Sequence, residues 1–238
     1  MAKRKVTFGE ILFVLIIIFV VAAILFPIFA KSRGPCGRAN ARNISCLGRE
    51  RQLGLALLQY TQSNDGFLPN IADAPGSRRT WRTAVTAFMP YLRTASLSGS
   101  VFHCPDAACT TGPDKLPVGY AANYSGNYNG GLLDKGNGAF AGPSSHPLSL
   151  SKFPAPDKLI LLCEVQDSAA PEFNIDDPVR FGPDKHILAP RHEGGSNYLL
   201  ADGHAKWLRP LATAHFWYRD AHRPLSANAE AVLRNAHG

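Results

Sequence analysis

The longest run of apolar residues in the chain lies near its N-terminus, at positions 11–30 (ILFVLIIIFVVAAILFPIFA). These twenty residues include no charged side chain, and Pro27 is their only poor helix former. At ~1.5 Å per residue such a helix is ~30 Å long, which matches the hydrocarbon core of a bilayer. The run is too long for the core of a cleaved secretory signal peptide. The pattern predicts a membrane-spanning helix with a water-soluble head behind it.

A second helical pattern follows a break at Gly34-Pro35-Cys36-Gly37, where two glycines and a proline interrupt the first helix. Apolar residues then recur at three- and four-residue intervals until Asn64-Asp65-Gly66, which ends the pattern. The stripe consists of Ile44, Leu47, Leu55 and Leu58, widened by Leu53, Leu57 and Tyr60. We therefore expect a basic leader at 1–5, a transmembrane stem helix at 6–33, a second stem helix at 34–66 and a globular head at 67–238.

The head shows shorter patterns of both kinds. A helix is predicted at 80–95 with Thr80 as its N-cap and Trp81 in the core, and Ser226 is expected to cap a terminal helix. Strands are predicted at 101–106, at 158–165, where the run KLILLCEV is apolar, and after residue 117. Asp202-Gly203 separates two alternating runs and predicts a hairpin at 197–208, with a turn that needs positive φ at both residues. The expected fold class is α+β, a long N-terminal transmembrane helix packed on an antiparallel sheet.

The charge of the chain changes this picture little. The formal net charge is +7, and part of it comes from Lys3, Arg4 and Lys5 in the leader. Six further basic residues occur between positions 31 and 51, where a solvated helix face is favoured over contact with lipid headgroups or DNA. We do not expect the protein to bind nucleic acid.

The chain has five cysteines, so at least one is unpaired or bonds to another chain. Cys163 lies inside the apolar run at 158–165 and is expected to be a buried free thiol. The other four, Cys36, Cys46, Cys104 and Cys109, allow three pairings, and disulfides are permitted if the head is outside the cytoplasm. Cys36–Cys46 with Cys104–Cys109 is the local solution, whereas Cys46–Cys104 would tie the stem helix to the head.

The N-terminal segment resembles that of type IV prepilins and type II secretion pseudopilins. When VTFGE (6–10) is aligned with the family's F-T-L-I-E, Val6 becomes the first residue of the mature chain and Glu10 the fifth. Pro27 then falls at the family's helix-kinking proline, and residues 24–33 and 46–69 also resemble the family. The family has Gly before the cleavage point where this chain has Lys5, so both a cleaved and an uncleaved leader remain open. Cysteines near positions 46 and 104 are also frequent in the family.

This resemblance implies a structural function. Subunits of the family are cleaved by a prepilin peptidase, are usually methylated at the new terminal amine, and assemble on an inner-membrane platform with other pilin-like subunits. In the assembly the residue equivalent to Glu10 pairs with a neighbour's terminal amine, which matters because an unpaired carboxylate in hydrocarbon costs several kcal/mol. The expected location is the inner membrane, single-pass, with a periplasmic or extracellular head. The alternative is a membrane-anchored extracytoplasmic binding module that does not polymerise.

The segment RHEGGSNYLLADGH resembles the H-x9-DG signature of a prepilin-like, processing-associated family, because nine residues separate His192 from Asp202-Gly203. His192, Asp202 and His204 could approach one another around the hairpin. We interpret them as structural, with Asp202 making the turn and His192 bonded to backbone. A metal site that adds His186 or Glu193 is the second interpretation.

Two other chemical interpretations are weaker. Asp176, Asp177 and Asp184 supply oxygen atoms of the kind that calcium prefers, and some pseudopilins hold calcium in a late loop, but the spacing does not fit a calcium loop. No metal or cofactor is therefore expected, and calcium is the remaining candidate. Ser196 is not part of a G-x-S-x-G elbow, and we expect no enzymatic activity.

Overall fold

The computed structural model describes twelve segments of the chain: residues 8–32, 35–73, 77–89, 100–107, 111–112, 114–125, 138–142, 146–166, 172–176, 188, 190–220 and 222–236. At residues 10, 24–32, 35–39 and 125 it describes the backbone only. The chain divides into two compact units, residues 1–41 and residues 42–238, and each is described by itself.

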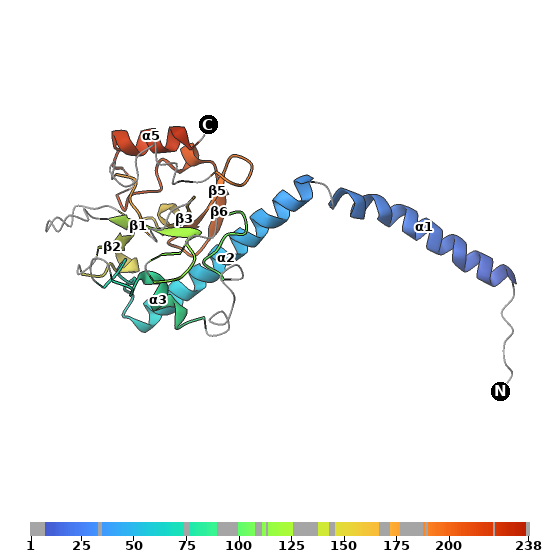
Figure 1. The fold of residues 1–238 in the computed structure, drawn as a ribbon, viewed down its shortest axis with the longest axis horizontal. Helices are drawn as coiled ribbons and strands as arrows, with labels where there is room; N and C mark the ends of the chain where they lie inside the picture. The colour runs from blue at the N-terminus through green and yellow to red at the C-terminus, as the bar shows by residue number, and fades with distance from the viewer. Residues whose placement is uncertain are drawn as a thin grey trace. The chain divides into compact units, whose positions relative to one another are not determined.

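The first unit contains helix α1, Phe8–Ser32 (Figure 1). Among the residues that the structure describes, no helix is both long enough and apolar enough to cross a membrane. The predicted transmembrane helix is therefore wrong, and so is the predicted single-pass location in the inner membrane.

Helix α2, Pro35–Ser63, begins within the predicted break and carries the chain into the second unit. Its buried face differs from the predicted stripe, because Ile44 and Leu55 are both 62% exposed. The fully buried positions recur at three and four residues and include one charged side chain, that of Glu50: Cys46, Glu50, Leu53 and Leu57. The helix ends as expected, with left-handed backbone at Asp65 (φ 53°) and Gly66 (φ 80°).

The second unit is built on one sheet of six strands in the order β2-β1-β3-β5-β6, with β4 also paired to β1 (Figure 1). The strand bounds are Tyr120–Ser125 for β1, Phe140–Ala141 for β2, Ile160–Glu164 for β3, Glu172–Phe173 for β4, Ser196–Leu200 for β5 and Ala205–Leu208 for β6.

The sheet is mixed, so the predicted antiparallel sheet is wrong. β1–β3, β3–β5 and β5–β6 are antiparallel, but β1 pairs in parallel with both β2 and β4. Parallel strands need a crossover of about a dozen residues or more, and residues 126–139 between β1 and β2 are long enough to provide one.

Side chains on the two faces of the sheet enter two separate cores. On one face, Leu199 of β5 joins a core with Leu53 and Leu57 of α2. On the other face, its neighbours Tyr198 and Leu200 join a core with Leu233 of the C-terminal helix. Because both faces are covered, all five residues of β3 are buried, which explains why this strand reads as a continuous apolar run.

The predicted helix at 80–95 is only partly present. Helix α3 spans Trp81–Thr86, Trp81 is fully buried as expected, and residues 90–95 lie outside the described chain. Arg82 of α3 and Asp114 form an ion pair whose two side chains are 0% exposed, and the guanidinium also donates to the carbonyls of Leu116 and Pro117. The segment 101–106 forms turns instead of the predicted strand.

The C-terminal elements agree better with the sequence. β5 and β6 form the hairpin, although its loop contains residues 201–204 and only Gly203 has positive φ (88°), so the predicted two-residue turn is wrong. Helix α5, Ala227–Asn235, is capped as predicted, because Ser226 Oγ accepts a hydrogen bond from Ala229 N at 3.1 Å. Short 3-10 helices lie at Leu150–Lys152 (η3), Pro156–Lys158 (η4) and Pro210–Thr213 (η6).

Candidate functional site

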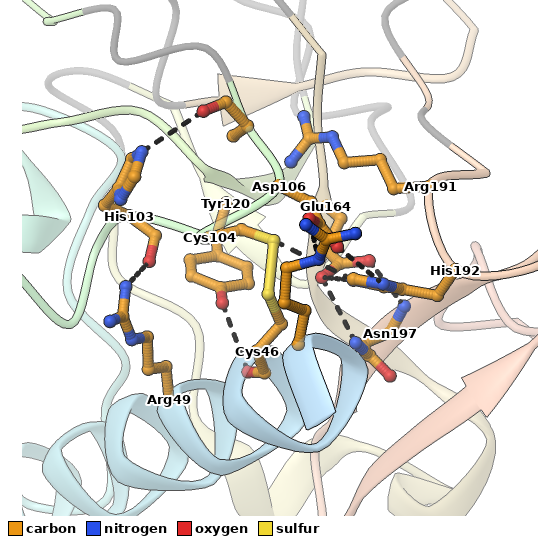
Figure 2. The surroundings of a disulfide bond; sticks show 12 residues. Cys46, Arg49, His103, Cys104, Asp106, Tyr120, Glu164, Arg191, His192 and Asn197 are labelled. Atoms are coloured by element: carbon orange, nitrogen blue, oxygen red, sulfur yellow. Dashed lines mark hydrogen bonds and ion pairs between the residues drawn. A yellow bond between two sulfur atoms is a disulfide. The ribbon is translucent and has the colours of Figure 1, made fainter. Parts of the chain in front are cut away.

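A disulfide joins α2 to the turn segment at residues 100–107. Cys46 and Cys104 are bonded, their Cα atoms are 5.2 Å apart, and 58 positions separate them in the sequence (Figure 2). Both cysteines are 0% exposed, and Tyr120 of β1 donates its hydroxyl to the Cys46 carbonyl at 3.1 Å. Of the pairings left open by the sequence, the structure selects the one that ties the second stem helix to the head.

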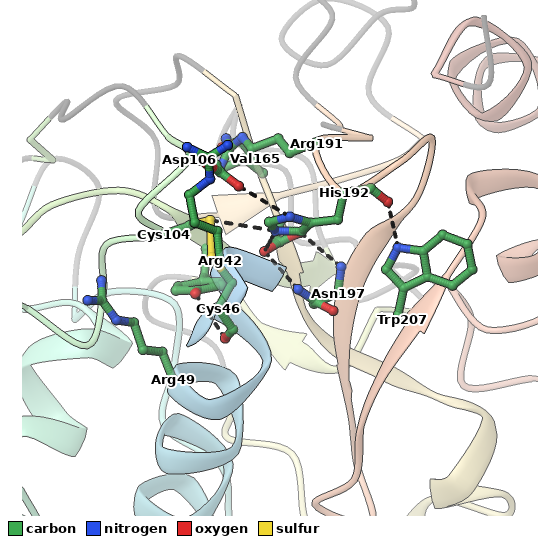
Figure 3. A network of polar contacts seen from close by, with 12 residues as sticks. Arg42, Cys46, Arg49, Cys104, Asp106, Val165, Arg191, His192, Asn197 and Trp207 are labelled. Carbon is green, nitrogen blue, oxygen red and sulfur yellow. Dashed lines mark hydrogen bonds and ion pairs between the residues drawn. A yellow bond between two sulfur atoms is a disulfide. The ribbon is translucent and has the colours of Figure 1, made fainter. Parts of the chain in front are cut away.

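His192 lies against this disulfide (Figure 3), and it stands between two carboxylates, those of Glu164 and Asp106 (Figure 2). Its Nε2 is 3.0 Å from Glu164 Oε1 and 3.8 Å from Cys104 Sγ, and its Nδ1 is 3.4 Å from Asp106 Oδ2. A ring with both N–H groups can donate to both carboxylates, whereas a neutral ring can donate to only one. His192 was predicted to hydrogen-bond the backbone of an adjacent loop; its main chain bonds that of Gly195, whereas its ring contacts the two carboxylates.

The backbone around His192 fixes the ring in place. His192 and Gly195 form a small antiparallel bridge just before β5, and Trp207 of β6 donates its indole N–H to the His192 carbonyl at 2.8 Å. A Cβ atom at Gly195 would overlap the Trp207 indole, so the indole requires glycine at this position. The sheet edge thus determines where the imidazole lies.

The disulfide, His192, Asp106 and Glu164 form one cluster, and Glu164 is its central carboxylate. It is the last residue of β3 and is 0% exposed. Its Oε2 accepts from the backbone N–H of Asn197 at 2.9 Å, and its Oε1 accepts from Asn197 Nδ2 at 3.1 Å. Adjacent antiparallel strands therefore orient this carboxylate toward His192 (Figure 2).

Glu50 is a second buried carboxylate, one turn after Cys46 on the same face of α2. Neither of its oxygens has a hydrogen-bond partner in the structure. Burial raises the pKa of Glu50 well above its ordinary value, and the nearby charge of Glu164 raises it further. The pKa of the Tyr120 hydroxyl is raised by the same causes, burial first.

Basic side chains surround the cluster rather than enter it. Arg42 pairs with Asp106 (Nε to Oδ1, 2.7 Å), and Arg49 donates to the carbonyls of Ser100 and His103. Arg191 donates to the Val165 carbonyl. These contacts hold the segment 100–107 and the residues after β3 around the disulfide.

The other predicted site residues lie elsewhere or outside the described chain. Asp202 pairs with the exposed His204 (Oδ2 to Nδ1, 2.9 Å), and within the described structure neither contacts His192. Asp176 accepts the Tyr218 hydroxyl at 2.6 Å and faces Arg223, so it serves structure. Positions 5, 6, 109, 177, 184 and 186 are not described, and at positions 10, 27 and 36 only the backbone is.

Sequence reasoning missed three carboxylates, Glu50, Asp106 and Glu164, together with Asn197. A local signal existed for two of them: Glu50 interrupts the apolar face of α2, and Glu164 ends an apolar strand. Buried carboxylates are rare unless paired, so such interruptions mark candidate sites. Cys163, by contrast, is the buried free thiol that was predicted, and burial raises its pKa.

Comparisons with known proteins leave the family of the chain undetermined: no family model, no curated protein and no solved structure matches it.

Proposed function

We propose that this chain is a pilin-like structural subunit that assembles with copies of itself, or with related subunits, through α1. The observation that supports this proposal is the solvent exposure of the apolar side chains of α1. Every large apolar side chain from Ile11 to Val21 is between 47% and 76% exposed, and the preceding Phe8 is 81% exposed. An apolar helix that finds no cover in its own chain favours packing against another apolar surface.

The energy available from this packing is large. Burial of one aliphatic or aromatic side chain contributes ~1.5–3 kcal/mol. Covering half of the apolar side chains from Ile11 to Val21 therefore contributes on the order of 10 kcal/mol before the entropy of ordering is subtracted. A bundle of parallel stems covers such a helix on several sides at once, whereas a head domain can cover one side at most.

The resemblance of the N-terminal segment supports the same function. Glu10 follows the leader at the position where pilins use a carboxylate to neutralise a neighbour's terminal amine. In a bundle of apolar stems this carboxylate is buried, so a charged partner offsets the cost of its desolvation. The expected partners are further pilin-like subunits, a prepilin peptidase and an assembly platform.

The decisive experiment compares one charge in the stem with the same charge in the head. Ile16→Asp places a carboxylate in the middle of α1, and Leu211→Asp places one at an exposed aliphatic position in η6. We expect the full chain and Leu211→Asp to form polymers visible by electron microscopy and sedimentation, and Ile16→Asp to stay monomeric. Equal assembly of the two variants contradicts the proposal.

Two further measurements test the register of the stem. Glu10→Leu is expected to leave the helix content unchanged and to stop assembly, and normal assembly of this variant refutes the charge pairing. N-terminal sequencing of the native protein is expected to begin at Val6, which places the terminal amine near Glu10 of a neighbour. A chain that starts at Met1 or Ala2 and remains monomeric would indicate a binding module that acts alone.

A further inference from the structure

The disulfide cluster contains the atoms of a tetrahedral metal site. The sulfurs of Cys46 and Cys104, a carboxylate oxygen of Glu164 and a ring nitrogen of His192 all lie within 4.8 Å of one another, and all four residues are buried. Thiolate, imidazole and carboxylate are the three ligand types of protein-bound zinc. We propose that the dithiol form of this chain binds one zinc ion with these four residues, and that the disulfide is the metal-free form.

The ligand atoms are already close together, and two of their distances lie near those of a metal site. Zinc bonds of 2.0–2.3 Å place the ligand atoms of a tetrahedron roughly 3.3–3.8 Å apart. His192 Nε2 is 3.0 Å from Glu164 Oε1 and 3.8 Å from Cys104 Sγ. The Nε2–Oε1 pair is slightly closer than this range, and the two sulfurs are much closer because they are bonded to each other. Reduction removes that bond and lets the sulfurs separate.

The residues around the four ligands are those that a zinc site needs. A histidine that binds metal through one nitrogen usually donates its other N–H to a carboxylate, and Asp106 Oδ2 lies 3.4 Å from His192 Nδ1. The carboxylate ligand is oriented in the same way, by the two hydrogen bonds from Asn197 to Glu164. Asp106 and Asn197 already make these contacts in the disulfide form, so the site is largely preorganised.

Glu50 is an independent sign that the cluster is built for a cation. It is 0% exposed, lies on the same face of α2 as Cys46, and has no hydrogen-bond partner for either oxygen. Buried carboxylates are normally paired, and Arg42, Arg49 and Arg191 have other partners. A divalent cation in the cluster supplies the positive charge that Glu50 and Glu164 lack.

The conversion between the two forms balances with a small-molecule dithiol as reductant. The reductant gives two electrons and two protons to the Cys46–Cys104 bond and becomes a cyclic disulfide. Each cysteine gains one proton, and zinc then displaces both protons to form two thiolate bonds. The inference concerns the head alone and does not depend on assembly through α1.

The test uses the full chain with Cys36→Ser and Cys109→Ser, so that only Cys46, Cys104 and Cys163 remain. The protein is reduced with dithiothreitol, separated from it under nitrogen, checked by thiol titration and titrated with Co²⁺. We expect one Co²⁺ per chain, the visible bands of tetrahedral cobalt and a thiolate charge-transfer band in the near ultraviolet. Zn²⁺ is expected to displace the cobalt and abolish the bands, and the oxidised protein is expected to show none.

Variants identify the ligands. Cys104→Ser and His192→Gln are expected to lose the tetrahedral spectrum, whereas Cys163→Ser is the matched control that keeps it. Asp106→Asn removes only the carboxylate that faces His192 Nδ1 and is expected to weaken Co²⁺ binding about 10- to 100-fold. Because the Asp106 side chain is 19% exposed, this variant keeps the test valid if a ligand variant does not fold.

Three results would overturn the proposal. The first is a reduced, folded chain that binds no Co²⁺. The second is a cobalt spectrum that survives in Cys104→Ser or is unchanged in affinity in Asp106→Asn. The third is a disulfide that dithiothreitol cannot open without unfolding the head, since the dithiol form must then lack the site.

Discussion

Removal of the disulfide is expected to lower the free energy of unfolding of the head by about 4 kcal/mol. The variant is the double substitution Cys46→Ala, Cys104→Ala, which leaves no unpaired thiol at the site. The two cysteines are 58 positions apart, and closing a loop of that length in the unfolded chain removes about 14 cal/mol/K of entropy, which is about 4 kcal/mol at 25 °C. A loss of this size is a large part of the 5–15 kcal/mol that stabilises a typical domain.

The assay is equilibrium unfolding in urea, followed by the fluorescence of the buried Trp81 and Trp217, with a chelator present so that no metal contributes. Cys163→Ala is the matched control, because it removes one buried sulfur that belongs to no disulfide. Twice the loss of unfolding free energy measured for Cys163→Ala estimates the packing cost of the double variant. The remainder is the contribution of the cross-link.

A double variant that loses no more than twice the Cys163→Ala effect would refute the reasoning. In that case the unfolded chain would already hold α2 near the segment 100–107, and the cross-link would restrict nothing further. A reduced wild-type chain, measured in the same buffer, is expected to lose only the contribution of the cross-link and therefore to unfold at a higher urea concentration than the double variant.

Three further predictions concern the head. Arg82→Met leaves the buried Asp114 carboxylate uncompensated and is expected to lower the free energy of unfolding by about 3–5 kcal/mol. A second substitution, Asp114→Leu, is expected to restore part of this loss. A double-mutant cycle in urea measures the coupling, and additive losses would contradict the prediction. The raised pKa of Glu50 predicts that native stability falls as pH rises above 4.5, by up to about 1.4 kcal/mol per pH unit, because the unfolded chain ionises before the folded one. Glu50→Gln is expected to lack this slope between pH 5 and the native pKa, and parallel stability curves for the two proteins would exclude the assignment. Gly195→Ala forces a methyl group into the Trp207 indole and is expected to lower the free energy of unfolding by about 1–3 kcal/mol, measured by thermal unfolding. An unchanged melting temperature would mean that the indole moves aside freely.

Features that depend on a few neighbouring residues could be predicted from the sequence. The cap at Ser226 was one, because its hydroxyl needs only the N–H three residues later. The buried strand at 160–164 and the free thiol of Cys163 were others, since an apolar run of that length has few alternatives. The hairpin was also predicted, although the turn between its strands is longer than two residues.

Features that depend on distant segments could not. The parallel pairing of β1 with β2 follows from where the chain returns after residues 126–139, and no local pattern encodes that return. The stripe on α2 was partly wrong because it included Ile44 and Leu55, which are exposed, and left out Cys46 and Glu50, which are buried. The predicted membrane-spanning helix was wrong, because no helix among the described residues is both long enough and apolar enough to cross a membrane.

The candidate site, too, could be predicted from the sequence only in part. The residue types were visible in the sequence, and His192 was singled out there, but its expected partners Asp202 and His204 lie in the hairpin turn away from its contacts. Its actual neighbours come from three places: Cys46 on α2, Cys104 and Asp106 in a turn segment, and Glu164 at the end of β3.

The sequence by itself determined an apolar N-terminal helix, the positions of the strongest strands and the chemistry on offer. Only the tertiary structure decided which cysteines bond, which carboxylates are buried and which histidine stands between them. Helix and strand periodicities repeat every two to four residues, so the sequence shows them directly. A buried charge depends on what covers it, and here the cover comes from segments up to 146 positions apart, between Cys46 and His192.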